Sequence, residues 1–461
     1  MVSLRMLRQL RLWSVFGPVL LLTFMIANVG HASDLAGGTA AARPSAKTAT
    51  TNPAHAAELP RTTFEAAPML FRSETTRIRY VGSEPIEKSN AGLGSLTSFA
   101  PAFIWKVNPR LGVGITEILP PISINTEVKD APINLLGQVN KVNLAVEAIS
   151  RGGLGGLVGY TVSDRFSIGL KAGFRAYGAN IVVTPSEGGA ALATIKLVES
   201  TFNMEAGFSW EVIEDKVDVG AVAGLFAMKS TKQSIDSPLL GAAGEGAGGP
   251  GAGGASSSAG VPLSGILFGT ALRFGENARV YLDIDWRRNP PSKEFSLVEF
   301  REKDRDLYDT VAVRTGIALS VLPNGGALLG GFRYEPSPIG AGGRGADSKS
   351  GFGAREVIEM STGLGELQPY WMIAGGARWN FGKSLRVESS DAKGSDKAGR
   401  EGTRSSGRKG ERRRGPTVTQ YSLGGGVAWQ KASLGIDENG ELPGAFTQTR
   451  LSLPIEFSWR F

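Results

Sequence analysis

The chain has 461 residues, enough for one large barrel or for two to three globular domains, and its lack of cysteine excludes disulfides, thiol catalysis and thiolate metal sites. Its net charge of +7 comes from three arginines among the first eleven residues and from a tract between Lys383 and Arg414 with 11 basic and 5 acidic residues. The remainder is nearly neutral, which argues against a nucleic-acid-binding domain.

The first predicted element is a secretory signal peptide at residues 1–32. The early arginines precede an apolar run from Leu12 to Val29, and Gly30-His31-Ala32 supplies small residues for cleavage near Ala32. The alternative is a single membrane anchor. It is less favoured because Pro18 interrupts the run and no other long apolar run follows. The pattern predicts export to a Gram-negative periplasm or outer membrane.

Residues 33–62 are rich in Ala, Thr and Pro and show no strand periodicity. Asn52-Pro53 indicates a turn, because proline disfavours the helical region for the residue before it. The composition alone indicates a flexible linker.

Amphipathic strands follow from residue 63 onward. Apolar residues at 202, 204, 206, 208, 210 and 212 alternate with small or polar ones, and this period of two gives an extended strand one apolar face. Similar runs occur at 64–80, 99–107, 113–115, 155–162, 166–174, 217–225, 266–274, 280–286, 311–321, 328–334, 370–381 and 417–429. Asp283, Asp285 and Arg287 share one face of their strand, which suits a polar lumen better than lipid.

The connections between these strands alternate in length. Short turns are predicted near 108–112, 163–165, 214–216, 275–277 and 323–326, and long polar links near 120–153, 185–194, 230–261, 288–306 and 336–369. Outer-membrane barrels show this alternation because one rim carries tight turns and the other carries loops. A soluble sandwich has no such requirement.

The last strand has large apolar residues at every second position from Leu451 to Phe461, with small, polar or charged residues between them. The pattern is typical of the closing strand of an outer-membrane barrel, and a soluble sandwich edge is the alternative. Phe457, Trp459 and Phe461 are then the predicted C-terminal signal for the barrel-assembly machinery. Pro454 removes one backbone donor from this strand.

The basic tract at residues 383–416 falls on the periplasmic side if strands are counted back from a periplasmic C-terminus. It faces outward if Glu356 to Leu367 forms a further strand, and could then bind lipopolysaccharide. We favour a disordered, solvated tract because of its Gly, Ser and charge content.

Motifs for catalysis or cofactor binding are weak. Gly246, Gly248 and Gly251 have G-x-G-x-x-G spacing but lie in low-complexity sequence with no strand before them. Gly382-Lys383-Ser384 resembles the end of a P-loop without its first glycine. His55 is the sole histidine after the signal peptide, which argues against a Ser-His-Asp hydrolase and a histidine metal site. We predict no enzyme activity, no cofactor and no metal.

Several short motifs, in order along the chain, resemble the FadL/TodX family of outer-membrane transporters for long-chain fatty acids and aromatic hydrocarbons. They are Asn52-Pro53-Ala54, the hairpin at 160–170, the Asp283 to Trp286 strand, and the segments 309–316 and 331–338. The resemblance implies about fourteen strands, an N-terminal hatch in the lumen, and a lateral or luminal route for a hydrophobic ligand. Residues 240–260 and 383–416 have no expected counterpart in that family.

The sequence therefore predicts an all-β fold, a transmembrane antiparallel β-barrel of about 14 strands at residues 63–461, with a plug at 33–62 and a low-complexity loop at 235–260. Asn52, Pro53 and Ala54 are the predicted plug motif. Phe103, Trp105, Trp210, Trp286 and Trp459 are predicted to face lipid or form an aromatic girdle. The predicted function is passive outer-membrane transport of hydrophobic small molecules, and a general porin or a structural or adhesive barrel is the alternative. Predicted partners are outer-membrane lipids, lipopolysaccharide, the hydrophobic ligand and the assembly machinery, with no nucleic acid.

Overall fold

The computed structural model describes residues 40–41, 44–66, 69–80, 86–93, 101–119, 122–135, 138–236, 252–275, 277–288, 292–295, 302–305, 309–323, 326–336, 370–381, 420–435 and 444–461. The predicted signal peptide, the glycine motif at 246–251, the candidate strand at 356–367 and the basic tract at 383–416 lie outside these residues. No helix in the described part of the chain is long and apolar enough to cross a membrane.

Two short helices precede the strands, α3 (Ala46–Thr51) and α4 (His55–Glu58). The described strands are β1 (Thr63–Ala66), β2 (Met69–Tyr80), β3 (Ile86–Leu93), β4 (Ala102–Asn108), β5 (Leu111–Leu119), β6 (Ile122–Leu135), β7 (Gln138–Ser163), β8 (Phe166–Pro185), β9 (Ala193–Ile213), β10 (Val217–Asp236), β11 (Ala252–Phe274), β12 (Ala278–Arg287), β13 (Ser292–Phe295), β14 (Glu302–Arg305), β15 (Thr310–Leu322), β16 (Gly326–Glu335), β17 (Tyr370–Phe381), β18 (Gln420–Gly435) and β19 (Gly444–Arg460).

Fourteen of the described strands close into an antiparallel barrel, in the order β1, β4, β5, β7, β8, β9, β10, β11, β12, β15, β16, β17, β18 and β19. The ring closes at β1, where Thr63 pairs with Arg460 of β19 on one side and with Ile104 of β4 on the other. The fold class predicted from the sequence, with its strand number, is confirmed.

The described strands are divided at two places where the sequence has prolines. The run predicted at 64–80 is divided into β1 and β2 around Pro68, and β5 and β6 are separated by Pro120-Pro121. β5 and β6 pair with successive parts of the long strand β7, and β2 pairs with β19 and β3. β1 has 4 residues and β4 has 7, against the roughly 9–11 residues that a tilted strand needs to cross a bilayer, and β2 continues along β19 where β1 ends.

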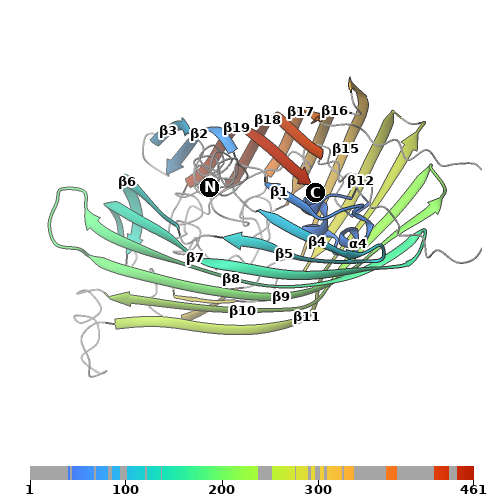
Figure 1. Ribbon diagram of the computed structural model, residues 1–461. Coiled ribbons are helices and arrows are strands. Elements are labelled where there is room, and N and C mark those ends of the chain that lie inside the picture. Colours follow the sequence, from blue (N-terminus) through green and yellow to red (C-terminus); the bar gives the residue numbers. More distant parts are fainter. Residues whose placement is uncertain are drawn as a thin grey trace, which may run out of the picture.

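The two ends of the barrel differ, and we call them the turn rim and the far rim. The turn rim carries the C-terminus, the start of β1, and the connections at 109–110, 164–165, 214–216, 275–277 and 323–325. Apart from the connection at 382–419, the longer connections join strand ends at the far rim, and β7 to β11 extend past the shorter strands toward it (Figure 1). β16 pairs directly with β17, so no extra strand enters between them, and the connection at 382–419 joins strands that end at the turn rim.

Strand alternation places apolar side chains outside and polar or small ones inside. On β17 and β18 the outward aromatics Trp371 and Trp429 meet edge to face, and Phe381 and Tyr421 lie opposite each other ten residues further toward the turn rim. Ten residues span about 33 Å along a strand and, at a tilt of about 40°, about 25 Å along the barrel axis, the height of an outer-membrane apolar band.

The strands are longer than predicted at three places. The segment at 120–153, predicted as a polar link, forms β6 and the first part of β7, because apolar residues alternate there as well. The predicted loop at 235–260 is shortened by β10, which continues to Asp236, and by β11, which begins at Ala252. The link at 288–306 contains the small β13–β14 hairpin. Pro454 lies at a register shift between β19 and β2, where a missing donor costs little.

Candidate functional site: the N-terminal segment and the inner barrel wall

The N-terminal segment, residues 40–41 and 44–62, lies against the inner wall of the barrel (Figure 1). Ser45 caps α3 through a reciprocal capping box with Thr48, in which each side chain accepts a backbone N–H at 2.9–3.0 Å. Because α3 and α4 are only one to two turns long, their stability depends on packing against the wall. Alanines of both helices join Leu59, Ala102 and Ile104 of β4, and Leu157 of β7, in one buried apolar cluster.

Asn52, Pro53 and Ala54 form the bend between the two helices and are buried. The Asn52 side chain donates to the carbonyl oxygens of Ala40 at 2.7 Å and Phe208 at 2.9 Å, and its Oδ1 accepts the N–H of Ala54 at 3.2 Å. One amide therefore links two parts of the segment to each other and to β9. The structure brings the three motif residues together at the wall.

A row of glycines on the inner wall receives this bend. We call Gly112, Gly159, Gly169, Gly207, Gly220 and Gly269 the glycine track. Gly112, Gly159, Gly169 and Gly207 are cross-strand partners in sequence on β5, β7, β8 and β9, and Gly220 of β10 pairs with Gly269 of β11. At each of these positions a Cβ would lie under 3.0 Å from another atom, and in all six cases an atom of Ala40 or of residues 52–57 is among them. The absence of side chains lets the segment's backbone lie directly on the wall.

Polar contacts fix both ends of the segment. Lys171 of β8 donates to the carbonyl of Thr50 at 2.8 Å, and Lys106 of β4 donates to the carbonyl of Ala57. The N–H of Lys47 donates to Glu65 of β1 at 2.6 Å, and the N–H of Ala40 donates to Asp283 of β12 at 3.3 Å. The segment is thus attached to strands on several sides of the barrel.

His55 lies on α4 and its side chain is fully buried. Burial lowers the pKa of His55 to about 4, partly opposed by the nearby backbone of Thr48 and Ala40. The imidazole is therefore neutral at pH 7. Within the described residues no group of three or more His, Cys, Asp or Glu side chains could hold a metal ion.

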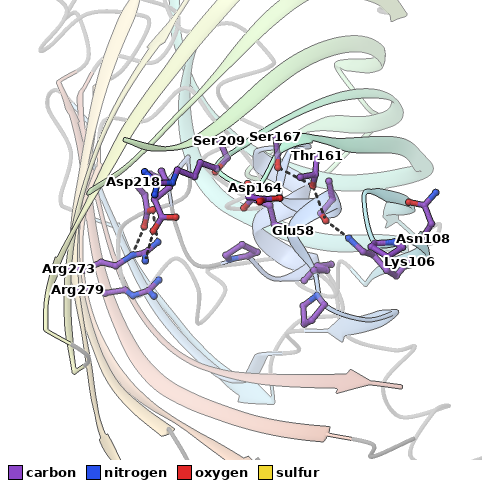
Figure 2. Close-up of a pocket in the computed structure, with 18 residues that line it drawn as sticks. Glu58, Lys106, Asn108, Thr161, Asp164, Ser167, Ser209, Asp218, Arg273 and Arg279 are labelled. Atoms are coloured by element: carbon purple, nitrogen blue, oxygen red, sulfur yellow. Dashed lines mark hydrogen bonds and ion pairs between the residues drawn. The ribbon is translucent and has the colours of Figure 1, made fainter. Parts of the chain in front are cut away.

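A cavity of about 750 Å³ lies between the end of the segment and the turn rim. Figure 2 shows Glu58 and Lys106 on one side of it and Asp218, Arg273 and Arg279 on the other. Arg273 bonds Asp218 at 2.5 Å and Glu211 at 3.0 Å. This cavity is polar and charged, so its lining does not suit an apolar ligand.

A second charged group lies on the inner faces of β12, β15 and β16. Arg287 and Arg314 each donate to Asp285 at 2.8 Å, and Arg287 also bonds Glu335 at 2.8 Å. Arg333 contacts the same glutamate. The prediction that Asp283, Asp285 and Arg287 face a polar interior is confirmed: the two aspartates are buried, and Arg287, which is partly exposed, pairs with Asp285 and Glu335 on the same inner face.

Toward the far rim the inner face changes character. Nine apolar side chains there are 0–6% exposed, and we call them the upper apolar patch: Val142, Leu144, Val146, Ala179, Ile181, Val183, Ala193, Ile195 and Leu197. Val146, Ile181 and Ile195 are direct cross-strand partners on β7, β8 and β9, which makes the patch continuous. The prediction placed two polar links here and missed the patch, although alternation of Val142, Leu144 and Val146 was visible in the sequence.

Aromatic side chains gather on the outside at the turn rim. Phe103, Trp105, Trp210 and Trp459 are 37–59% exposed, as predicted for lipid-facing residues, whereas Trp286 is half-buried. Phe461 packs near Trp459 and Phe103, and its N–H donates to the carbonyl of Thr62 at 3.1 Å. The end of the chain therefore closes the barrel next to the start of β1.

Neither a protein-family model nor a curated protein matches this sequence. Solved structures are similar across nearly the whole chain. A FadL homologue from Pseudomonas aeruginosa matches with a TM-score of 0.57 and 13% identity, covering 95% of this chain and 99% of its own. The toluene transporter TodX from Pseudomonas putida matches with a TM-score of 0.51 and 12% identity, covering 94% and 99%. A TodX mutant described as a monoaromatic hydrocarbon channel matches with a TM-score of 0.54 and 13% identity, covering 94% of this chain and 99% of its own. The chain therefore has the fold of the FadL and TodX barrels, and the resemblance inferred from its motifs is confirmed at the level of the fold.

Proposed function

We propose that this protein is an outer-membrane channel that passes hydrophobic small molecules by passive diffusion around an N-terminal plug. The observation that carries the proposal is the upper apolar patch. A barrel that passes only polar solutes has no use for nine contiguous apolar side chains on its inner face. These side chains are 0–6% exposed, so the patch can receive an apolar ligand only after a motion that uncovers it.

Membrane location follows from the outer surface. Apolar side chains cover the outside of the ring over about 25 Å, the height of an outer-membrane apolar band. The fold shared with the FadL homologue and TodX supports a bacterial outer membrane with the turn rim in the periplasm.

The plug role rests on how the N-terminal segment is held. Asn52, Pro53 and Ala54 lie on the glycine track, where no side chain separates the segment from the wall. A passing ligand then has two routes: along the inner wall that the segment leaves uncovered, or sideways through the wall at the short strands β1 and β4. Both routes need a motion of the segment or of its neighbours, and neither needs an energy source.

The substrate class we propose is long-chain fatty acids or similar hydrophobic compounds. The solved barrels with this fold include a toluene transporter, which supports an apolar ligand without naming the one used here. The protein would act without catalysing a reaction. We further propose that Phe457, Trp459 and Phe461, on the closing strand, are read by the barrel-assembly machinery, and that outer-membrane lipids and lipopolysaccharide surround the barrel.

Growth on a long-chain fatty acid as sole carbon source, with and without this protein, tests the proposal. We expect growth to depend on the protein, while growth on acetate does not. Liposomes containing the purified protein should be impermeable to small sugars. Sugar permeation at porin rates without any dependence of growth would instead favour a general porin.

A further inference from the structure

Glu58 ends α4 and closes the N-terminal segment against the wall. Its carboxyl group lies within hydrogen-bonding reach of the hydroxyls of Ser167 on β8 and Ser209 on β9. The preceding carbonyl, of Ala57, accepts from Lys106 and, at 3.5 Å, from Thr161. Side chains from four strands, β4, β7, β8 and β9, therefore meet at two consecutive residues of the segment. The next residue, Leu59, is fully buried.

The surface that Glu58 retains faces the 750 Å³ cavity at the turn rim. Each element around that cavity contributes a charged group: Lys106 on β4, Asp164 and Arg165 on the β7–β8 turn, Glu211 on β9, Asp218 on β10, Arg273 on β11 and Arg279 on β12. Lys106 favours the ionised form of Glu58 and Asp218 opposes it. Asp218 and Glu211 are themselves paired with Arg273, so Lys106 is the main cation that acts on Glu58.

Burial dominates the balance. It raises the pKa of Glu58 from its ordinary value of 4.5 to about 7, more than the two serines and Lys106 lower it. In a detached segment Glu58 would be solvated and would return toward its ordinary value. The attached state therefore binds a proton more tightly than the detached one.

We propose that Glu58 is a proton-operated latch, which holds the end of the N-terminal segment on β8 and β9 when protonated and releases it toward the turn-rim cavity when ionised. This goes beyond the proposed function, because it concerns the attachment of the segment and needs no hydrophobic ligand. In the periplasm, a rise in pH would loosen the lower end of the segment while the glycine track still holds residues 52–57.

The direction of the effect follows from the raised pKa. Attachment is strongest below about pH 4.5, weakens as the pH rises from about 4.5 to about 7, and then stays constant. A full separation of these two values corresponds to at most roughly a 300-fold change in the attachment equilibrium.

A cysteine at position 59 reports the latch, because the chain has no cysteine of its own. Leu59→Cys in the full-length, membrane-reconstituted protein is labelled with a membrane-impermeant maleimide between pH 5 and 8.5. Each rate is divided by that of Ser163→Cys, an exposed position, to remove the intrinsic pH dependence of the thiol. Folding of every variant is checked by the resistance of the barrel to SDS at room temperature.

We expect normalised labelling of Leu59→Cys to rise at least tenfold with a midpoint near pH 7. Adding Glu58→Gln, which stays neutral, should keep labelling slow at every pH, and adding Glu58→Ala, which cannot reach either serine, should make it fast at every pH. Asp164→Asn, a matched change of an exposed carboxylate in the same cavity, should leave the midpoint unchanged. Labelling that does not depend on pH, or the same midpoint with Glu58→Gln, would overturn the latch. Neither outcome depends on transport.

Discussion

Side chains of β8 and β9 alternate between the inner and outer faces along the whole strand, but the polarity of the inner face differs between the half near the turn rim and the half near the far rim. Near the turn rim their inner positions are small or polar, as in Gly169, Lys171 and Glu205, and their outer positions are large and apolar. Near the far rim the inner positions become apolar, as in Ile181 and Ile195, and the outer ones include polar residues such as Asn180 and Lys196. The change occurs beyond the last exposed apolar residues of the outer face, where the strands extend past the apolar band. A strand that leaves lipid gains nothing from an apolar outer face, so its apolar side chains turn to the interior.

The two halves also hold different contents. The N-terminal segment lies on the lower inner face, where its backbone needs glycine opposite it, and the upper inner face carries buried apolar side chains. Attachment of the segment near the turn rim therefore depends on the absence of side chains at the glycine track. The upper apolar patch depends on the presence of large side chains. An added side chain should therefore be harmful at the glycine track, and the loss of an apolar side chain should be harmful at the upper apolar patch.

Removing residues 34–60 should have the largest effect, because it empties the lower half. We expect single-channel conductance in planar bilayers to rise by about tenfold, since a polar lumen without a plug fills with water. The barrel should still form, because its ring pairs without the deleted residues. An unchanged conductance in a folded barrel would mean that the segment does not block the lumen.

Adding a side chain to the glycine track should have the second-largest effect on conductance. Gly207→Val would force a Cβ onto Asn52 and Pro53, which opposes attachment of the segment by about 1–3 kcal/mol and should raise conductance. Gly156→Val is the matched control, since its Cβ would point into open space and valine suits a strand. Equal behaviour of the two variants would contradict direct contact between segment and wall.

A polar substitution in the upper half should weaken ligand binding and leave conductance unchanged. Ile195→Asn places an amide in the upper apolar patch, whereas Lys196→Asn changes the next residue, which is exposed. We expect the first to reduce the affinity for a fluorescent long-chain fatty acid by about tenfold, corresponding to about 1.4 kcal/mol. If Lys196→Asn lowers affinity as much, the patch is not the binding surface.

Asn52→Ala should weaken attachment of the segment without introducing a clash. The carbonyls of Ala40 and Phe208 would each lose a buried donor, which should cost about 1–3 kcal/mol of attachment. Hydrogen exchange should then quicken at the amides of α3 and α4, with Thr51→Ala as a neighbouring control. Exchange that stays slow would show that the glycine track holds the segment without this amide.

The sequence by itself determined most of the barrel strands, because a period of two and a turn are local patterns. Residues 202–212 and 451–461 could be recognised as amphipathic without knowledge of their partners. The barrel followed from repeating that pattern with turns between, whereas the predicted plug motif rested on the resemblance of three adjacent residues to the FadL/TodX family. His55 could be assigned to the plug region in the same way.

Only the tertiary structure decided which residues of neighbouring strands lie side by side on the inner face of the barrel. The glycine track is a row across six strands, so it exists only once the register of each strand against its neighbour is set. The upper apolar patch depends on a register shift between Ser150 and Gly152 in β7, which places Val146 and Gly159 on the same inner face although one is even-numbered and the other odd-numbered. A bulge reverses the parity of every residue beyond it, and no local pattern states which of the two faces will be covered.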